Sequence, residues 1–250
     1  MGFSQSIIDS ETYILDNFYD GSSATIFYIH GGAYWLQPSV LHYHFLYKLA
    51  KKNHYRIILP VYPKAPNSNY MGCEAMITKA YKEVLKTYQL DTSQLVFMGD
   101  SAGGGFLANF IKKVQSDDMV MPKKIILISP WMDVSMENPQ ITLVQKEDPL
   151  LCKSDLKTRG NIFAQKSPYA LSAMKPIDGN YKEIPKIDII TGTKDILFPD
   201  ILEFQKKASV NNRQIHTYIF KDMIHVFPLF PTKESDLAQE LITHILEQNP

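Results

Sequence analysis

The chain has 250 residues, and its 26 lysines and arginines balance 26 aspartates and glutamates, so the formal net charge is zero. A neutral chain with no basic stripe and no long run of one sign disfavours nucleic acid and anionic membrane surfaces as partners. The two cysteines, Cys73 and Cys152, lack the paired spacing of a zinc site, which disfavours a structural metal or a disulfide framework. The length suits one large α/β domain, so we expect residues 1–250 to form a single domain.

The first residues lack the basic and apolar regions of a secretory signal. No stretch approaches the roughly 18 apolar residues of a membrane helix. We therefore expect a cytoplasmic protein with no membrane span. The sequence leaves the oligomeric state open.

Short β-branched or aromatic runs alternate along the chain with longer segments of helical periodicity. This pattern indicates an α/β fold with a mostly parallel central sheet and helices on both faces. The predicted strands cover residues 12–18, 25–30, 56–61, 95–98, 124–128, 186–191 and 215–220. The predicted helices cover residues 39–52, 70–89, 103–116, 198–211 and 233–247.

Residues 131–183 break this alternation. They combine several proline-containing turns with two short helix-like pieces, and they contain no clear strand. We interpret them as an insertion beside the sheet, after the sixth strand region, and as a candidate lid rather than a separate domain.

The five residues Gly99-Asp-Ser-Ala-Gly103 lie between an apolar run at 95–98 and a helix-like run of small residues. A strand that turns sharply into a helix holds one side chain out, and flanking glycines let the two backbones pass closely. This arrangement makes Ser101 a candidate nucleophile. The alternative is an ordinary Gly-Ser turn between a strand and a helix.

A serine hydroxyl needs a base within hydrogen-bond reach and a third group that orients the base. In parallel sheets such groups collect in the loops at the carboxyl ends of the strands. Asp195 follows the predicted strand 186–191, and His225 follows the strand 215–220. The chain order Ser101, Asp195, His225 is the order of α/β-hydrolases.

Other residues are candidates for these two roles. The remaining histidines outside the turn at residue 30 do not follow a predicted strand; they are His42, His44, His54, His216 and His244. The rivals to Asp195 as the orienting acid are Asp200, Asp222 and Glu203. For His225 itself, the alternative is a partly buried loop histidine without a catalytic role.

The turn His30-Gly31-Gly32-Ala33 follows the predicted strand 25–30. Attack on a carbonyl places negative charge on its oxygen, and each donor aimed at that oxygen contributes about 3 kcal/mol. We expect the oxyanion hole to use the amides of Gly32, Ala33 and Ala102, with Gly31 enabling the bend. His30 is expected to be structural. The alternative is a tight turn without a catalytic role.

Together, His30-Gly-Gly-Ala-Tyr-Trp35, Tyr62-Pro-Lys-Ala-Pro66, Gly99-Asp-Ser-Ala-Gly-Gly104, Asp195 and His225 resemble the hormone-sensitive-lipase-like branch of the α/β-hydrolases, over about residues 25–230. The resemblance implies the α/β-hydrolase fold and carboxylic ester hydrolysis through an acyl-serine, without a cofactor. It also implies that Asp100 braces the turn around Ser101 and that the segment beginning at Tyr62 lies near the site.

Two departures from the family pattern affect these expectations. Ala33 stands where the family commonly has a third glycine, although its amide remains available. Only 29 residues precede His30, which leaves little room for the family's N-terminal cap helices and outermost strand. We therefore expect a more open site, shaped by residues 131–183, Tyr34 and Trp35.

The resulting hypothesis is a serine carboxylesterase acting on small-molecule esters with small to medium acyl groups. Tyr34, Trp35 and Tyr62 are the expected substrate-binding residues. A carbohydrate deacetylase, an amidase or a peptidase would use the same triad. A catalytically silent ligand-binding protein on a hydrolase scaffold is the alternative of another class.

Overall fold

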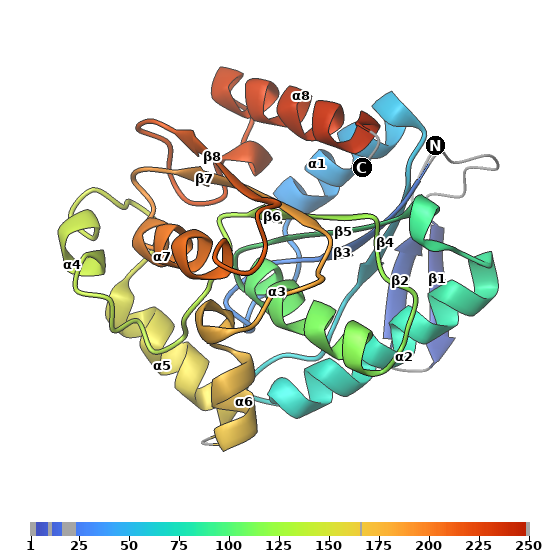
Figure 1. Cartoon of the computed structure of the whole chain (residues 1–250), viewed down its shortest axis with the longest axis horizontal. Helices are drawn as coiled ribbons and strands as arrows, with labels where there is room; N and C mark the ends of the chain where they lie inside the picture. The colour runs from blue at the N-terminus through green and yellow to red at the C-terminus, as the bar shows by residue number, and fades with distance from the viewer. Residues whose placement is uncertain (1–3, 10–11, 17–23, 166, 249–250) are drawn as a thin grey trace.

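The computed structural model describes residues 4–9, 12–16, 24–165 and 167–248. An eight-stranded sheet runs through these residues in the order β1-β2-β4-β3-β5-β6-β7-β8. Helices cover both of its faces (Figure 1). The strands are β1 (Ser4–Asp9), β2 (Thr12–Asp16), β3 (Thr25–Ile29), β4 (Arg56–Pro60), β5 (Leu95–Asp100), β6 (Lys124–Ile128), β7 (Lys186–Gly192) and β8 (Ile215–Phe220).

The six strands from β4 to β8 in this order are parallel, as the sequence predicts. Every residue of β3, β5 and β6 is buried, because helices cover both faces of the sheet. Strand β2 pairs antiparallel with β4, and β1 pairs antiparallel with β2. The expectation of too little room for an outermost strand is therefore wrong. Residues 17–18 of the predicted strand 12–18 lie outside the described residues.

The five predicted helices are present: α1 (Val40–Asn53), α2 (Tyr70–Tyr88), α3 (Ser101–Ser116), α7 (Phe198–Ala208) and α8 (Lys233–Glu247). The bounds of α8 are those predicted, and the other four helices have one or both ends shifted. Helices α1 and α8 pack on one face of the sheet, and α2, α3 and α7 pack on the other. Helix α3 begins at Ser101, two residues earlier than predicted, so the candidate nucleophile is its first residue.

The described part of residues 131–183 contains three α-helices, α4 (Ile141–Val144), α5 (Lys153–Ala164) and α6 (Pro168–Ala173), and a 3-10 helix at Pro176–Asp178, where the sequence predicts two helix-like pieces. No strand interrupts the described part of this insertion, as the sequence predicts. Met136, Ile141 and Phe163 are each 0% exposed and belong to the core on the α2 and α3 face. The insertion is therefore packed into the domain core.

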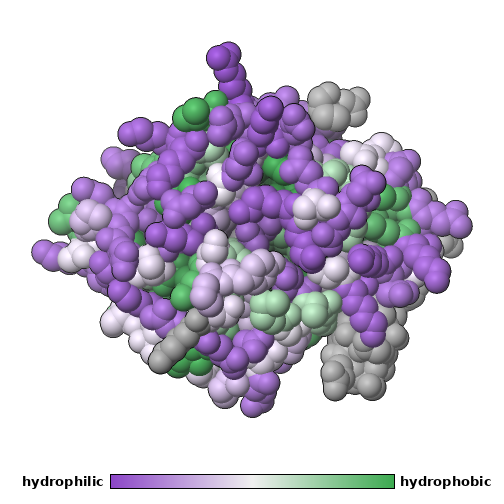
Figure 2. Space-filling model, turned by 60° about the horizontal axis from the view of Figure 1, so that its bottom comes forward, coloured by the Kyte–Doolittle hydropathy of each residue, from purple (hydrophilic) through white to green (hydrophobic). Residues whose placement is uncertain are grey.

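The surface carries no broad apolar face in the view of Figure 2, where hydrophilic residues predominate and hydrophobic residues form small separate patches. Among the described helices, none combines the length and the hydropathy that crossing a membrane requires.

The packing of the insertion leads to a stability prediction. The Phe163 ring stacks on Tyr34 with centroids 4.5 Å apart, so Phe163→Ala should lower the free energy of unfolding by about 3–5 kcal/mol. The neighbouring Ile162, 44% exposed, is the control, and Ile162→Ala should cost less than about 1 kcal/mol. Urea denaturation measures both, and equal losses would contradict the anchoring of α5.

Candidate active site

Ser101 lies where β5 passes directly into α3, with no residue between the strand and the helix. Its φ of 50° is in the left-handed region, which a residue with a Cβ adopts only at a cost of about 1–2 kcal/mol. Gly103 permits the close approach of α3 to β3, because a Cβ there would overlap the carbonyl oxygen of Ile29. The junction therefore projects the Ser101 side chain from a strained and tightly packed turn.

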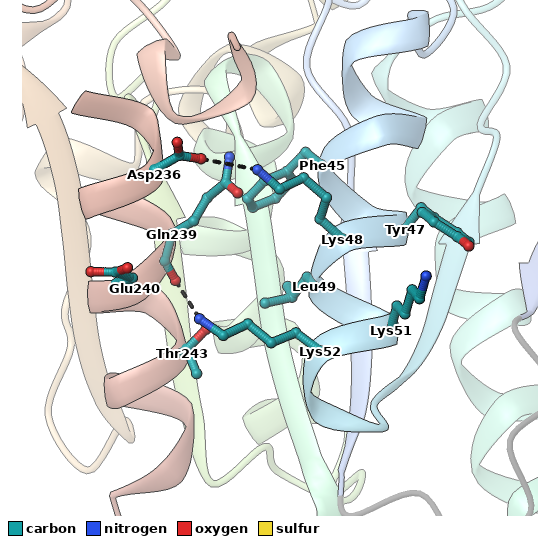
Figure 3. Close-up of a pocket in the computed structure, with 10 residues that line it drawn as sticks. All are labelled: Phe45, Tyr47, Lys48, Leu49, Lys51, Lys52, Asp236, Gln239, Glu240 and Thr243. Atoms are coloured by element: carbon teal, nitrogen blue, oxygen red, sulfur yellow. Dashed lines mark hydrogen bonds and ion pairs between the residues drawn. The ribbon is translucent and has the colours of Figure 1, made fainter. Parts of the chain in front are cut away.

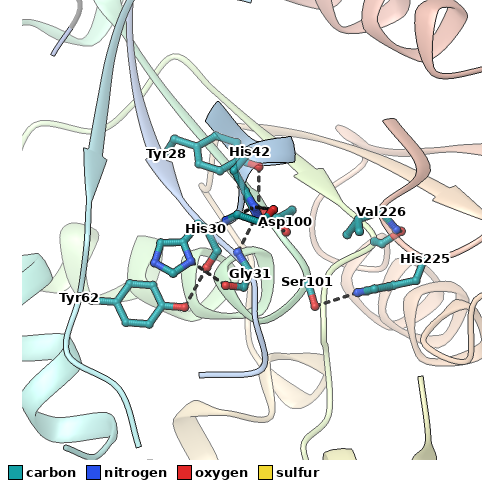
Figure 4. A network of polar contacts seen from close by, with 11 residues as sticks. Tyr28, His30, Gly31, His42, Tyr62, Asp100, Ser101, His225 and Val226 are labelled. Carbon is teal, nitrogen blue, oxygen red and sulfur yellow. Dashed lines mark hydrogen bonds and ion pairs between the residues drawn. The ribbon is translucent and has the colours of Figure 1, made fainter. Parts of the chain in front are cut away.

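The structure brings together the three residues that the sequence proposes for a triad. The Ser101 Oγ lies 2.9 Å from the His225 Nε2, and the His225 Nδ1 lies 2.8 Å from the Asp195 Oδ2. Figure 4 shows His225 reaching toward Ser101 from the loop after β8. These distances suit proton transfer between the hydroxyl and the imidazole.

The surroundings of His225 favour its charged form. Burial alone lowers the pKa of His225, but the charge of Asp195 and its hydrogen bond to the ring raise it by more than burial lowers it. The pKa therefore lies above its ordinary value. Asp195 is 0% exposed, and its second oxygen accepts the N–H of Leu197 at 2.9 Å. The carboxylate is thus held by two donors in a site closed to water.

The acid and base loops are joined by backbone hydrogen bonds. The N–H of Thr193 donates to the carbonyl of Phe220 at 3.1 Å, and the N–H of Lys194 donates to that of Met223 at 2.9 Å. The hydroxyl of Ser129, at the end of β6, accepts the N–H of Val226 at 3.1 Å. The loops after three neighbouring strands therefore set the position of His225 together.

The rivals to Asp195 lie in other contacts. Burial raises the pKa of Asp200 to about 7, with the charges of Asp133 and Glu203 adding to this effect. Asp222 forms an ion pair with Lys194, and Glu203 forms one with Lys207.

The other histidines are also placed elsewhere. His42 contacts Asp100, His216 lies 3.6 Å from Asp188 on the β7 and β8 edge, and His244 contacts Gln248. His44 and His54 are exposed.

The turn after β3 has an unusual backbone. Gly32, Ala33 and Tyr34 have φ values of 110°, 52° and 63°, three left-handed residues in succession. The Gly31 N–H donates to the Asp100 Oδ1 at 2.9 Å, so it braces the turn and is not available for an oxyanion. The amides of Gly32 and Ala33 remain as the donors that this turn can offer.

Tyr34 and Tyr62 are each 1% exposed, which revises the expectation that they bind substrate. The Tyr34 hydroxyl donates to the Ala102 carbonyl at 3.0 Å, and the Tyr62 hydroxyl donates to the His30 carbonyl at 2.8 Å. Tyr34 thus connects the turn after β3 to the start of α3, and Tyr62 connects the segment after β4 to the same turn.

Trp35 is half-buried, with the Arg159 guanidinium 5.5 Å from its ring centroid. It remains a candidate for substrate contact.

His30 is structural, as expected from its position in the turn. Its ring stacks on Tyr62 with centroids 4.5 Å apart. Burial and the nearby charge of Lys64 lower the pKa of His30 to about 3, so this ring is neutral over the physiological range.

Asp100 connects the candidate nucleophile to the turn after β3 (Figure 4). Its Oδ1 accepts the Tyr28 hydroxyl at 2.7 Å in addition to the Gly31 N–H, and its Oδ2 lies 3.3 Å from the His42 Nε2. Burial alone raises the pKa of Asp100, but the charge of His42 and these donors lower it by more than burial raises it. The pKa therefore lies below its ordinary value. Asp100 is therefore a buried, fully engaged carboxylate.

Cavities elsewhere on the described surface are separate from this site. One of about 610 Å³ opens between α1 and α8, where Lys48 pairs with Asp236 at 3.0 Å (Figure 3). Two others measure about 750 Å³ beside α7 and about 500 Å³ beside α5. None is lined by a candidate triad residue. Within the described ranges, no group of three or more histidine, cysteine or acidic residues could hold a metal ion.

Sequence reasoning missed three contributors to the site. Ser129 could have been suspected from its place at the carboxyl end of a predicted strand. Tyr28 lies within a buried strand, where nothing in the sequence marks its contact with Asp100. Asp148 lies in the irregular insertion, and no local sequence pattern indicates that its carboxylate accepts the Ile196 N–H of the Asp195 loop.

Comparisons with known proteins agree with this fold. A family model described as the alpha/beta hydrolase fold matches residues 26–229. An esterase of Acinetobacter venetianus is 26% identical over 212 residues, covering 84% of this chain and 70% of the relative. An acetyl-hydrolase of Streptomyces hygroscopicus is 22% identical over 203 residues, covering 81% of this chain and 68% of the relative.

Among solved structures, a hormone-sensitive lipase from a metagenome library superposes with a TM-score of 0.89 at 22% identity, covering 98% of this chain and 84% of the other. At this identity the match shows the fold.

The contacts of Asp100 predict a large effect of removing its charge. Asp100→Asn should lower the free energy of unfolding by about 3 kcal/mol, because the Gly31 N–H and the His42 ring lose a buried anionic acceptor. Tyr28→Phe removes one donor to the same carboxylate and should cost about 1 kcal/mol. Thermal and urea denaturation measure both, and an Asp100→Asn protein as stable as the wild type would refute this assignment.

Proposed function

The chain belongs to the alpha/beta hydrolase fold family, and we propose that it is a serine carboxylesterase with Ser101 as its nucleophile. The observation that carries the proposal is the chain of two hydrogen bonds from Ser101 through His225 to Asp195, of 2.9 and 2.8 Å. The relatives named esterase and acetyl-hydrolase support the same class of reaction.

In the acylation step, the Ser101 Oγ attacks the carbonyl carbon of the ester while the His225 Nε2 takes the hydroxyl proton. The imidazolium that forms is stabilised by Asp195, which also holds the ring so that Nε2 faces the serine. When the tetrahedral intermediate collapses, the bond to the alcohol oxygen breaks and His225 gives the proton to the leaving alcohol. An acyl-serine remains.

The negative charge of the tetrahedral intermediate falls on the former carbonyl oxygen. We assign its stabilisation to the amides of Gly32, Ala33 and Ala102, with each donor contributing about 3 kcal/mol when water is excluded. Gly31 is assigned to bracing, because its N–H donates to Asp100.

In the deacylation step, a water molecule takes the place of the alcohol. His225 removes a proton from this water as it attacks the acyl carbon, and then returns the proton to the Ser101 Oγ as the acid leaves. The chemistry needs no cofactor, and the cytoplasmic location stays an expectation from the sequence.

The triad does not choose the leaving group, so an amidase, a peptidase or a carbohydrate deacetylase would use the same residues. The ester reaction is favoured because the relatives named above are an esterase and an acetyl-hydrolase. The name of the Streptomyces relative also supports the preference for small acyl groups that the sequence suggests.

Active-site labelling tests the hydrolase against a silent binding scaffold. A fluorophosphonate should label the wild-type protein at Ser101, and Ser101→Ala should abolish the label, because the hydroxyl is the attacking group. His225→Ala should reduce the labelling rate at least about 100-fold, since the base is lost. Mass spectrometry of the labelled peptide identifies the residue. Absence of a label on the wild type would favour the binding scaffold.

The acyl preference is tested with aryl esters of increasing chain length. We expect kcat/KM to peak at acetyl to butyryl esters and to fall by about tenfold or more at decanoyl, because a small acyl site gains nothing from a longer chain. Ser101→Ala protein gives the background rate for each ester. A maximum at long chains would overturn the small-acyl assignment while leaving the triad intact.

A further inference from the structure

We infer that Asp148, in the insertion between α4 and α5, is a positioning residue for the triad: it holds the loop of Asp195 in place and adds its own negative charge near His225. The inference rests on the proposed function, because it concerns the chemistry of the same site. The hydrogen bonds of the Asp148 carboxylate go to backbone N–H groups and not to Ser101 or the ring of His225.

The first observation is a direct bond between the insertion and the acid loop. The Asp148 Oδ2 accepts the N–H of Ile196 at 2.9 Å, across 48 positions of the chain. The next amide, that of Leu197, donates to the Asp195 Oδ1 at 2.9 Å. Two carboxylates from different segments therefore bind successive amides of one turn. Since Ile196 is 0% exposed, its side chain is also held by the core.

The second observation is that Asp148 is itself held rigidly. Its Oδ1 accepts the N–H groups of Leu150 at 2.8 Å and Leu151 at 2.9 Å. The Gln145 side chain closes the same loop, donating to the Leu151 carbonyl at 2.7 Å and accepting the Lys153 N–H at 2.6 Å. The loop around Asp148 is thus braced from within before it contacts the acid loop.

These contacts require a carboxylate. Both oxygens of Asp148 accept N–H groups, so an asparagine would direct its own NH₂ group at one of these donors whichever way the amide is turned. Asp148→Asn therefore breaks either the bond to Ile196 or the turn at Leu150 and Leu151, and it removes the charge as well.

The third observation is electrostatic. Three carboxylates act on the His225 ring, and each comes from a different element: Asp195 from the loop after β7, Asp148 from the insertion and Asp100 from the end of β5. All three favour the imidazolium, which burial disfavours. The imidazolium is the form that His225 takes while it holds the Ser101 proton, so the charge of Asp148 stabilises the same state as Asp195 does.

The test compares the wild type with Asp148→Asn and Asp148→Glu. Glu147→Gln is the matched control, because it removes one negative charge from the neighbouring exposed residue. The pH profile of kcat/KM on an acetyl aryl ester is the first measurement. The second is the pKa of His225 by NMR of protein with labelled histidine, assigned with His225→Gln, which needs no substrate. Circular dichroism confirms folding of each variant.

The wild-type rate requires neutral His225, so kcat/KM falls as the pH drops through the pKa of His225, which lies above the ordinary value of about 6.5. Without the Asp148 charge the imidazolium is less stable, so the pKa of His225 should fall. We expect Asp148→Asn to move the acid midpoint down by about half a pH unit and to lower the plateau about tenfold through kcat.

Asp148→Glu separates the two effects, because it keeps the charge and displaces the acceptor oxygens. It should lower the plateau and leave the midpoint within about 0.2 unit of the wild type. Glu147→Gln should match the wild type in both quantities. If Asp148→Asn does not fold, Asp148→Glu carries the test through its plateau.

The inference is overturned if Asp148→Asn has the plateau and the His225 pKa of Glu147→Gln, or, where only Asp148→Glu folds, if that variant has the wild-type plateau. These outcomes are distinct from a failure of the proposed function. A wild type that neither hydrolyses esters nor reacts with a fluorophosphonate would refute the esterase, while the NMR titration of the same proteins still decides whether Asp148 acts on His225.

Discussion

A helix that starts on the residue directly after a buried strand must pass close to the neighbouring strand, and the first residue of α3 meets this constraint with a left-handed backbone. Ser101 occupies that position. Its own carbonyl accepts the N–H of Trp131 at 2.9 Å, and the carbonyl of Ala102 accepts the Tyr34 hydroxyl at 3.0 Å. The strained backbone at Ser101 is therefore held by contacts from the insertion and from the turn after β3.

The same junction also connects Ser101 to the other half of the proposed site. Asp100 precedes Ser101, and its carboxylate binds the Gly31 N–H, so one strand end supports both the serine and the turn to which we assign the oxyanion donors. His42 from α1 and Tyr28 from β3 complete the contacts of this buried carboxylate. Displacing Asp100 would therefore disturb Ser101 and the turn after β3 together.

The order of the sheet brings the proposed base and acid together. Strands β5, β6, β7 and β8 are neighbours, so the loops at their carboxyl ends meet at one edge although 124 positions separate Ser101 from His225. Ser129 at the end of β6 and Asp148 from the insertion bind backbone amides next to His225 and Asp195, respectively. Supporting contacts thus reach the proposed triad from the end of β6 and from the insertion.

The sequence by itself determined the parallel sheet, the turn around Ser101 and the placement of Asp195 and His225, because each of these depends on a short pattern at the end of a strand. Only the tertiary structure decided that Tyr34 and Tyr62 are buried, that the Gly31 N–H donates to Asp100, and that an outermost strand β1 is present. It alone revealed Asp148 beside the acid loop. These features depend on pairings between distant segments, and such pairings leave no periodicity or motif in the chain.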